Sequence, residues 1–211
     1  MNVLKSLNWR YAVKKFDPNQ KLTASKLEVL TEAFNLTATS YGLQPLRLVV
    51  VSDKDMQEQL VEASMNQTQV RDASHVLVIC VEKEVRAPYV DTYFDRVREV
   101  RDTPETILKP FRETLKKQFH TQDAEKTRQW AINQAYLALG NLLTVCALEA
   151  IDACPMEGFD AGKFDELLGL KEKNLKSVVI LALGYRDAEN DYLTNLKKVR
   201  LPLGKFVTRT N

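Results

Sequence analysis

The feature that most constrains the fold is one long segment, residues 122–150, that shows no wide polar face at helical spacing. Its apolar side chains are Trp130, Ile132, Ala135, Tyr136, Leu137, Leu139, Leu142, Leu143, Val145, Cys146 and Leu148. A helix that is apolar all round must be buried all round. The rest of the chain offers few apolar strands to cover it, so we expect a second subunit to cover part of it, with Gly140 allowing close approach. The alternative is the central helix of a monomer.

Three short runs rich in Val, Ile and Leu, at residues 46–52, 74–81 and 177–184, are typical of strands buried on both faces. Helices should then cover both sides of the sheet. Residues 1–211 are therefore predicted to form a single α+β domain with three α/β/α layers and a mixed central sheet.

Capping residues and prolines mark the shorter helices. Thr23 is a good N-cap for a helix running to about residue 38, and Asp53 for one running to about residue 63. Residues 88–119 alternate aromatic and charged side chains, and they predict two exposed amphipathic helices broken near Pro104 and Pro110. This pair forms a helical excursion from the domain.

The chain is basic at both ends and acidic between them. Residues 1–16 hold four cations and residues 192–211 hold five, with no acid in either stretch, although the net charge is only +2. Apolar residues such as Trp9 and Phe206 are interleaved with these cations, which favours packed segments that offer cations to an anion. Solvated basic edges and a nucleic-acid-binding arm are the alternatives.

Several functional classes are excluded by what the sequence lacks. The seven glycines stand singly and form no GxGxxG or GxxxxGK[ST], so no glycine-rich phosphate cradle is expected. His75 and His120 have no companions at metal-ligand spacing, and no serine lies in a GxSxG elbow. The three cysteines show no CxxC spacing, the longest apolar runs are too short for a membrane span, and no leader-like segment opens the chain. We therefore expect a cytoplasmic protein that binds neither a metal nor a membrane.

Five short sequence fragments, taken in their order along the chain, indicate a protein family. They are Arg10-x-x-x-Lys14, the hydroxyl-rich residues 37–45, Asp-Ala-Ser-His-Val at 72–76, Pro-Met-Glu-Gly-Phe at 155–159 and Lys-Val-Arg-Leu-Pro at 198–202. Alone, residues 155–159 suit a structural turn as well as a ligand-contacting loop at a strand end, and residues 37–45 suit an ordinary loop. Together they resemble the FMN-dependent NAD(P)H nitroreductase family, in particular its oxygen-insensitive nitroreductase and flavin reductase branch, over nearly the whole chain.

The resemblance implies a nitroreductase-like fold and an intertwined homodimer with two FMN sites, each built from both chains. By match to the family pattern, Arg10, Lys198 and Arg200 would hold the flavin phosphate through charge-assisted hydrogen bonds. Lys14 would lie near the pyrimidine edge of the flavin, where an ammonium stabilises the negative charge of the reduced ring.

The same match places five further residues. Asn66 would read the pyrimidine edge, and the backbone N–H groups of Glu157 and Gly158 would face N5 and O4 of the ring. Ser40 and Gln134 would reach in from the partner chain. In relatives the segment at 88–119 forms a lid over the flavin.

Four positions depart from the family pattern. Ala12 stands where a serine is usual, Tyr11 where a histidine is frequent, Leu46 where a tryptophan follows Gln-Pro, and Gln69 where a second basic residue lies. Tyr11 and Ala12 still count, beside Arg10, among the residues that the resemblance implies for cofactor binding. Cofactor binding should survive these changes, while substrate shape and the choice between NADH and NADPH stay open.

The function implied is two-electron, ping-pong reduction of nitroaromatics, quinones or related acceptors by NAD(P)H through FMN. The cofactor carries the redox chemistry, so no catalytic acid–base residue of the protein is expected. The alternatives are reduction of another acceptor, such as an enone, a pteridine or free flavin, and a non-catalytic flavin-binding dimer. A basic protein that binds nucleic acid would show steep salt dependence, and its cations are too few and too interleaved with apolar groups.

Overall fold

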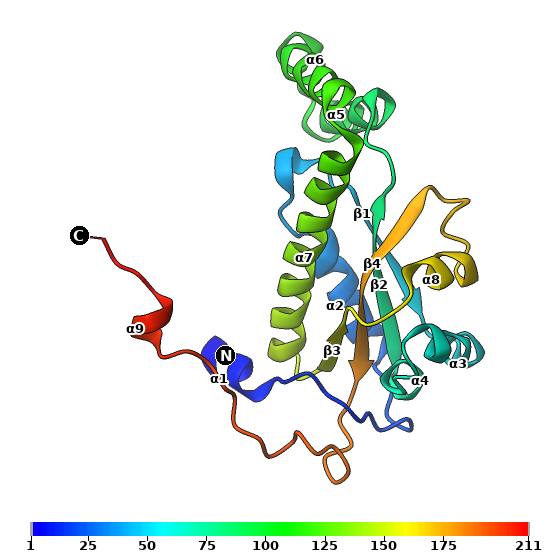
Figure 1. Ribbon diagram of the computed structural model, residues 1–211. Helices are drawn as coiled ribbons and strands as arrows, with labels where there is room; N and C mark the ends of the chain where they lie inside the picture. Colours follow the sequence, from blue (N-terminus) through cyan, green and yellow to red (C-terminus); the bar gives the residue numbers. More distant parts are fainter. Residues whose placement is uncertain (1, 211) are drawn as a thin grey trace.

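The computed structural model describes residues 2–210 and has a four-stranded sheet at its centre (Figure 1). The strand order is β1 (Leu46–Val51), β2 (His75–Glu82), β4 (Leu175–Gly184) and β3 (Asp152–Met156). The three predicted runs are β1, β2 and β4, and β3 is an additional strand. Residues 155–159 are thus only partly a loop, because Pro155 and Met156 pair with β4. An edge strand tolerates such a proline.

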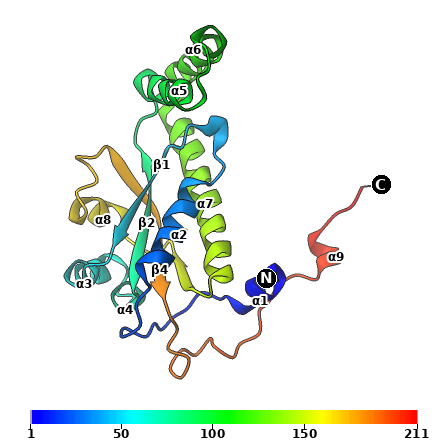
Figure 2. The same ribbon diagram turned by 180° about the vertical axis from the view of Figure 1, so that it is seen from behind.

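Helices cover both faces of the sheet, so the predicted three-layer α/β/α fold is confirmed (Figures 1 and 2). One face carries α2 (Ala24–Asn35) and α7 (Ala124–Leu148), and the other carries α3 (Lys54–Ala63), α4 (Gln69–Asp72) and α8 (Ala161–Leu167). All pairings between the four strands are antiparallel, so the expected mixed sheet is wrong for these strands. Within residues 2–210, parallel pairing is limited to one bridge, Ala12 with Ala153.

The sequence predicts a mixed sheet, and not an antiparallel one, because both of its faces are apolar. Along β2, Val76 and Val78 face the core under α3 and α8, while Leu77 and Ile79 face the core under α7. A continuous apolar run reports burial on both faces. It does not report the direction of the neighbouring strand.

Helix α7 is the long apolar segment, begun by Asp123, whose side chain accepts hydrogen bonds from the Glu125 and Lys126 backbone N–H groups. It has the length and apolarity of a membrane span, but it packs along the sheet as a core helix does. Its outer face carries Tyr136 and Leu137, which are 40% and 54% exposed. One chain therefore covers only part of this helix.

Helices α5 (Ala87–Arg101) and α6 (Glu105–Thr121) stand together at one end of the sheet and share their own apolar cluster (Figure 1). The break between them falls at Asp102, in the left-handed conformation, and at Pro104. The second expected break is wrong, since Pro110 lies inside α6. A proline removes one backbone hydrogen bond from a helix. The packing of Leu108 and Leu115 in the cluster keeps α6 continuous despite this loss.

The other predicted helices begin where expected. Thr23 and Asp53 accept hydrogen bonds from the backbone N–H groups of Lys26 and Met56 as N-caps. Helix α2 ends at Asn35, earlier than expected, and the chain then enters the 3-10 turn η1 (Ser40–Gly42).

Both chain ends are exposed. Helix α1 (Val3–Trp9) has no buried residue, and the closing segment with α9 (Leu203–Phe206) runs away from the body of the protein (Figures 1 and 2). Leu4 is 71% and Phe206 75% exposed. The expectation of packed ends is met for Val13 and Phe16, which are buried in the core, and is not met for α1 and the closing segment, whose apolar side chains have no facing surface within one chain.

Candidate functional site

The segment after α1 runs along the outer edge of β3. Ala12 bridges to Ala153, and the Val13 N–H donates to the Ala153 carbonyl at 3.3 Å. Lys14 therefore lies against the strand, with its Nζ 4.0 Å from the Cys154 Sγ. The contacts with the edge of β3 hold this segment in place. Helix α1 does not help to hold it, because it has no buried residue.

Three cations from the two ends of the chain meet at the start of this segment. The Lys198 ammonium donates to the Arg10 carbonyl. Burial, and then the charge of Arg200, lower the pKa of Arg10. Burial, and then the charges of Arg10 and Arg200, lower the pKa of Lys198. Within residues 2–210 none of the three forms an ion pair.

The Arg10 guanidinium shows what this cluster lacks. Its Nε is buried and has no hydrogen-bond partner. An unsatisfied buried donor on a charged group is costly. A dianion with several acceptor oxygens would satisfy the donor and relieve the repulsion among the three cations, so the cluster fits a phosphate group.

Glu157 and Gly158 follow β3 and lie beside the loop that ends α3. Gln67 Nε2 in that loop donates to the Gly158 carbonyl at 3.0 Å. A Cβ at Gly158 would lie 3.1 Å from the Gln67 amide nitrogen and 3.3 Å from the Met65 sulfur, so a larger residue would push this loop away. Asn66 is exposed and in the left-handed conformation, with φ 57°. The predicted neighbours Asn66, Glu157 and Gly158 are thus close together.

The strip of surface along β3 joins the three cations to Glu157. Helix α7 packs against β3 and allows the length of this strip to be judged. The charge of Arg10 acts on the thiol of Cys146, whose pKa burial raises to about 12. At the other end, the Tyr136 hydroxyl donates to Glu157 Oε1 at 2.8 Å. Ten residues of helix separate these two positions, which is roughly 15 Å. An elongated ligand with an anionic group at the Arg10 end would suit this arrangement.

Ser40 and Gln134 form a second group. The Ser40 N–H donates to Gln134 Oε1 at 2.9 Å, and Gln134 is 5% exposed. Gln134 and Tyr136 are two residues apart, so they project about 200° apart around α7. Within one chain, the pair therefore faces away from the strip that contains Glu157.

The four residues that depart from the family pattern are each accommodated by contacts within the chain. Leu46 is buried in β1 and Gln69 in α4, at 6% and 8% exposure. Ala12 makes the bridge to β3. Tyr11 packs its ring on the Arg186 guanidinium, 4.5 Å from ring centroid to Cζ.

A buried ion pair that the sequence patterns did not indicate holds the opening segment. Arg186 lies between the rings of Trp9 and Tyr11 and donates to the Asp152 carboxylate, through Nε at 2.8 Å and through a second nitrogen. Asp152 is 4% exposed. Arg10 stands between the two aromatic residues in sequence, so this stack fixes its backbone. The signal available in the sequence was an acid opening an otherwise apolar strand.

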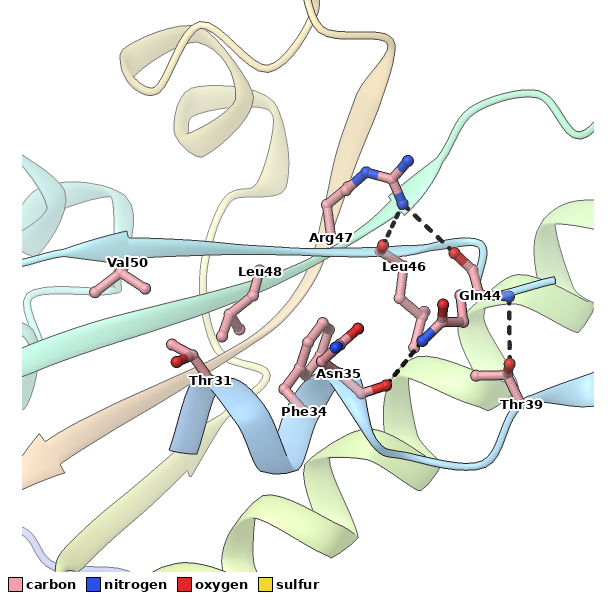
Figure 3. A pocket seen from close by; sticks show the side chains of 9 residues that line it. All are labelled: Thr31, Phe34, Asn35, Thr39, Gln44, Leu46, Arg47, Leu48 and Val50. Carbon is pink, nitrogen blue, oxygen red and sulfur yellow. Dashed lines mark hydrogen bonds between the residues drawn. The ribbon is translucent and has the colours of Figure 1, made fainter. Parts of the chain in front are cut away.

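A cavity of about 290 Å³ lies elsewhere, between α2 and the free edge of β1 (Figure 3). Phe34, Leu46, Leu48 and Val50 give it an apolar wall, and Arg47 lies at its rim. It contains none of the predicted cofactor-binding residues. The strip along β3 is therefore the candidate flavin site.

Comparison with known proteins gives the family. Residues 7–185 match the model of the nitroreductase family. The chain is 31% identical over 218 residues to the oxygen-insensitive NAD(P)H nitroreductase of Enterobacter cloacae, covering 99% of both chains. It is also 31% identical over 220 residues to the protein of that name from Salmonella typhimurium, which covers 99% of both chains. The chain therefore belongs to the nitroreductase family.

Solved structures share the fold. A nitroreductase-like protein from Streptococcus mutans superimposes with a TM-score of 0.85 at 22% identity, over 99% of this chain and 98% of that one. A protein from Exiguobacterium sibiricum, solved in complex with FMN, gives 0.85 at 18% identity, over 100% and 98%. An enone reductase of gut-bacterial fatty acid metabolism gives 0.81 at 20% identity, over 100% and 98%.

Proposed function

We propose that this protein is an FMN-dependent oxidoreductase that uses NAD(P)H to reduce nitroaromatics, quinones or related acceptors. The observation that carries the proposal is the buried, unpartnered Arg10 Nε within a cluster of three cations. When bound, FMN would take a hydride from NAD(P)H and pass two electrons to the acceptor in a ping-pong sequence. Family membership, and relatives named NAD(P)H nitroreductases, support the same activity.

The protein's own part is to bind and orient the cofactor. Arg10, Lys198 and Arg200 hold the phosphate, so charge-assisted hydrogen bonds replace a glycine-rich cradle. Lys14, held against β3, supplies the cation at the pyrimidine edge, and Asn66 reads that edge with its amide.

At the far end of the strip, the backbone N–H groups of Glu157 and Gly158 would donate to the flavin ring when FMN is bound. Gly158 is packed closely against the Gln67 loop, which supports a fixed backbone at this point. Ser40 and Gln134 act on the flavin of the other subunit, since their pair faces away from the strip of their own chain.

The functional unit is an intertwined homodimer. The closing segment projects from the body and exposes Leu196, Val199, Leu201, Leu203, Phe206 and Val207. The partner offers matching apolar surface at the outer face of α7 and at the edge of β1 with its cavity. Burial of this much apolar surface favours association.

Helices α5 and α6 act as a lid on a single nitroreductase-like domain spanning 1–211. The Tyr41 ring next to Ser40 lies edge-on to Phe111 of α6, at 6.1 Å between centroids. The lid thus contacts the loop that faces the partner's flavin. A cytoplasmic location agrees with three cysteines that are all free and buried.

The test begins with colour. The purified protein, supplied with FMN, should retain a yellow flavin and bleach when NADH or NADPH is added without air. Double-reciprocal plots with both substrates varied should give parallel lines. A protein that retains no flavin refutes the proposal, one that is yellow but never bleached is the non-catalytic dimer, and intersecting lines refute the ping-pong order. A panel of acceptors that includes enones and free flavin then identifies the acceptor class.

The dimer has its own test. Removal of residues 195–211 takes away the exposed arm and two of the three phosphate cations. Light scattering should show a dimer for the full chain and a monomer or unstable dimer for the truncated one. An unchanged dimer would refute the role of the arm.

A further inference from the structure

Asp191 is a buried acid with an unusual number of hydrogen-bond donors. It follows β4 by a few residues and is 5% exposed. Its Oδ2 accepts the backbone N–H groups of Lys14 at 2.8 Å and Lys15 at 3.2 Å, together with the Tyr11 hydroxyl at 3.2 Å. Its Oδ1 accepts the Leu193 N–H at 2.9 Å. Each carboxylate oxygen is thus satisfied by protein donors.

These contacts join the opening segment to the segment after β4. The Asp187 N–H donates to the Lys15 carbonyl at 2.9 Å, and Phe16 bridges to Arg186. Asp191 is therefore the side chain that fixes the backbone of Lys14 from the side opposite β3. The Lys14 ammonium, in contrast, contacts the Cys154 sulfur and not the acid.

We propose that Asp191 is a positioning residue for the flavin site: its carboxylate holds the Lys14 backbone so that the ammonium is placed at the pyrimidine edge before the cofactor binds. This inference rests on the proposed function. Asp191 acts through Lys14, since its own oxygens are fully engaged by Tyr11, Lys14, Lys15 and Leu193.

The sign of the effect separates positioning from simple electrostatics. A negative charge near the site repels the FMN phosphate and disfavours a negatively charged reduced ring. Removing that charge alone would tighten FMN binding and raise the midpoint potential. Releasing Lys14 from its place would do the opposite, because the ammonium that stabilises the reduced ring would be lost from it.

The experiment measures the FMN dissociation constant and the midpoint potential of the full-length protein. Asp191→Asn, Lys14→Met and the double variant form a cycle, and Glu189→Gln, an exposed acid two residues from Asp191, is the matched charge control. Asp191→Asn should weaken FMN binding about tenfold or more, the effect of one hydrogen bond to a charged group, and should lower the potential. Added to Lys14→Met it should neither weaken FMN binding nor lower the potential any further, because only the effect of removing the charge, which has the opposite sign, remains.

Two results would overturn the inference. One is tighter FMN binding or a raised potential in Asp191→Asn, and the other is an effect that persists undiminished in the Lys14→Met background. A wild-type protein that binds no FMN would instead refute the proposed function. If Asp191→Asn does not fold, hydrogen exchange of the flavin-free wild type tests the inference instead. The peptide around Lys14 and Lys15 should already be protected from exchange without FMN. Protection that appears only with FMN would refute a positioning role for Asp191.

Discussion

Replacement of Arg10 by alanine tests the phosphate cluster most directly. The guanidinium carries a buried Nε without a partner, and its backbone carbonyl, which alanine retains, accepts from Lys198. The change therefore removes one cation of the cluster and leaves Lys198 and Arg200 in place. A hydrogen bond to a charged group contributes about 1.5–3 kcal/mol, and each 1.4 kcal/mol is tenfold in affinity, so the FMN dissociation constant should rise about 10- to 150-fold.

The structure argues for the lower part of that range. Arg10 and Lys198 each have a pKa lowered by burial and by neighbouring cations, so the cluster is under mutual repulsion without its anion. Removal of one cation relieves part of this repulsion and offsets part of the lost contact. An increase of about tenfold is the central expectation.

The assay is quenching of flavin fluorescence on titration into the flavin-free protein, with FMN and riboflavin in parallel. Riboflavin lacks the phosphate, so its affinity should not change in Arg10→Ala. Lys5→Ala, an exposed cation of the same end, is the matched control and should leave both affinities unchanged. An unaltered FMN affinity in Arg10→Ala, or an equal loss for riboflavin, would show that Arg10 does not hold the phosphate.

Three further outcomes concern stability. Asp152→Ala leaves the Arg186 charge without its buried partner, which costs about 3–5 kcal/mol and lowers the melting temperature by roughly 6–20 °C in thermal denaturation. Burial alone would raise the pKa of Asp191, but its hydrogen bonds from Leu193, Lys14, Lys15 and Tyr11 lower the pKa overall. The Asp191 carboxylate therefore contributes fully to the free energy of unfolding above its ordinary pKa of 3.8, and this contribution is lost as the pH falls through the lower pKa of the folded state. Between about pH 5 and pH 2, the free energy of unfolding measured with urea should therefore decrease less steeply in Asp191→Asn than in the wild type. Gly42→Ala places a Cβ 2.7 Å from the Tyr93 hydroxyl at a residue with φ 72°, and should cost about 1 kcal/mol or more in the same melting assay.

Much of the fold could be predicted because burial leaves a periodic signal. The apolar runs of β1, β2 and β4 and the unbroken apolar surface of α7 report how each element is covered. Strand β3 was missed because its five residues include Pro155 and lie at the sheet edge, where pairing on one side suffices. Strand direction was missed because apolar faces on both sides are compatible with either direction.

The cationic part of the candidate site was predictable for a similar reason. The two stretches without acids indicate cations that could gather on an anion, and the resemblance to the nitroreductase family then singles out Arg10, Lys198 and Arg200. The acids that hold this site in place leave at most a single charge beside an apolar run, as Asp152 does, and nothing that identifies their partners. Asp191 and Tyr11 are 180 residues apart in sequence, and the pair Asp152 and Arg186 joins a strand start to a loop 34 residues away. Contacts of this kind depend on the finished topology, so no local pattern reports them.

Two features of the single chain are both explained by the proposed homodimer. Tyr136, which contacts Glu157, and Gln134, which contacts Ser40, project about 200° apart around α7, so in the proposed dimer these two groups serve different flavins. Its arm also exposes apolar side chains that its own body does not cover. In the proposed homodimer, a second copy related by a two-fold axis would present the missing group to each strip and the missing surface to each arm at the same time. Loss of the arm should therefore cost flavin affinity beyond the loss of Lys198 and Arg200, and a truncated chain that binds FMN as well as the Lys198→Ala, Arg200→Ala double variant would contradict this coupling.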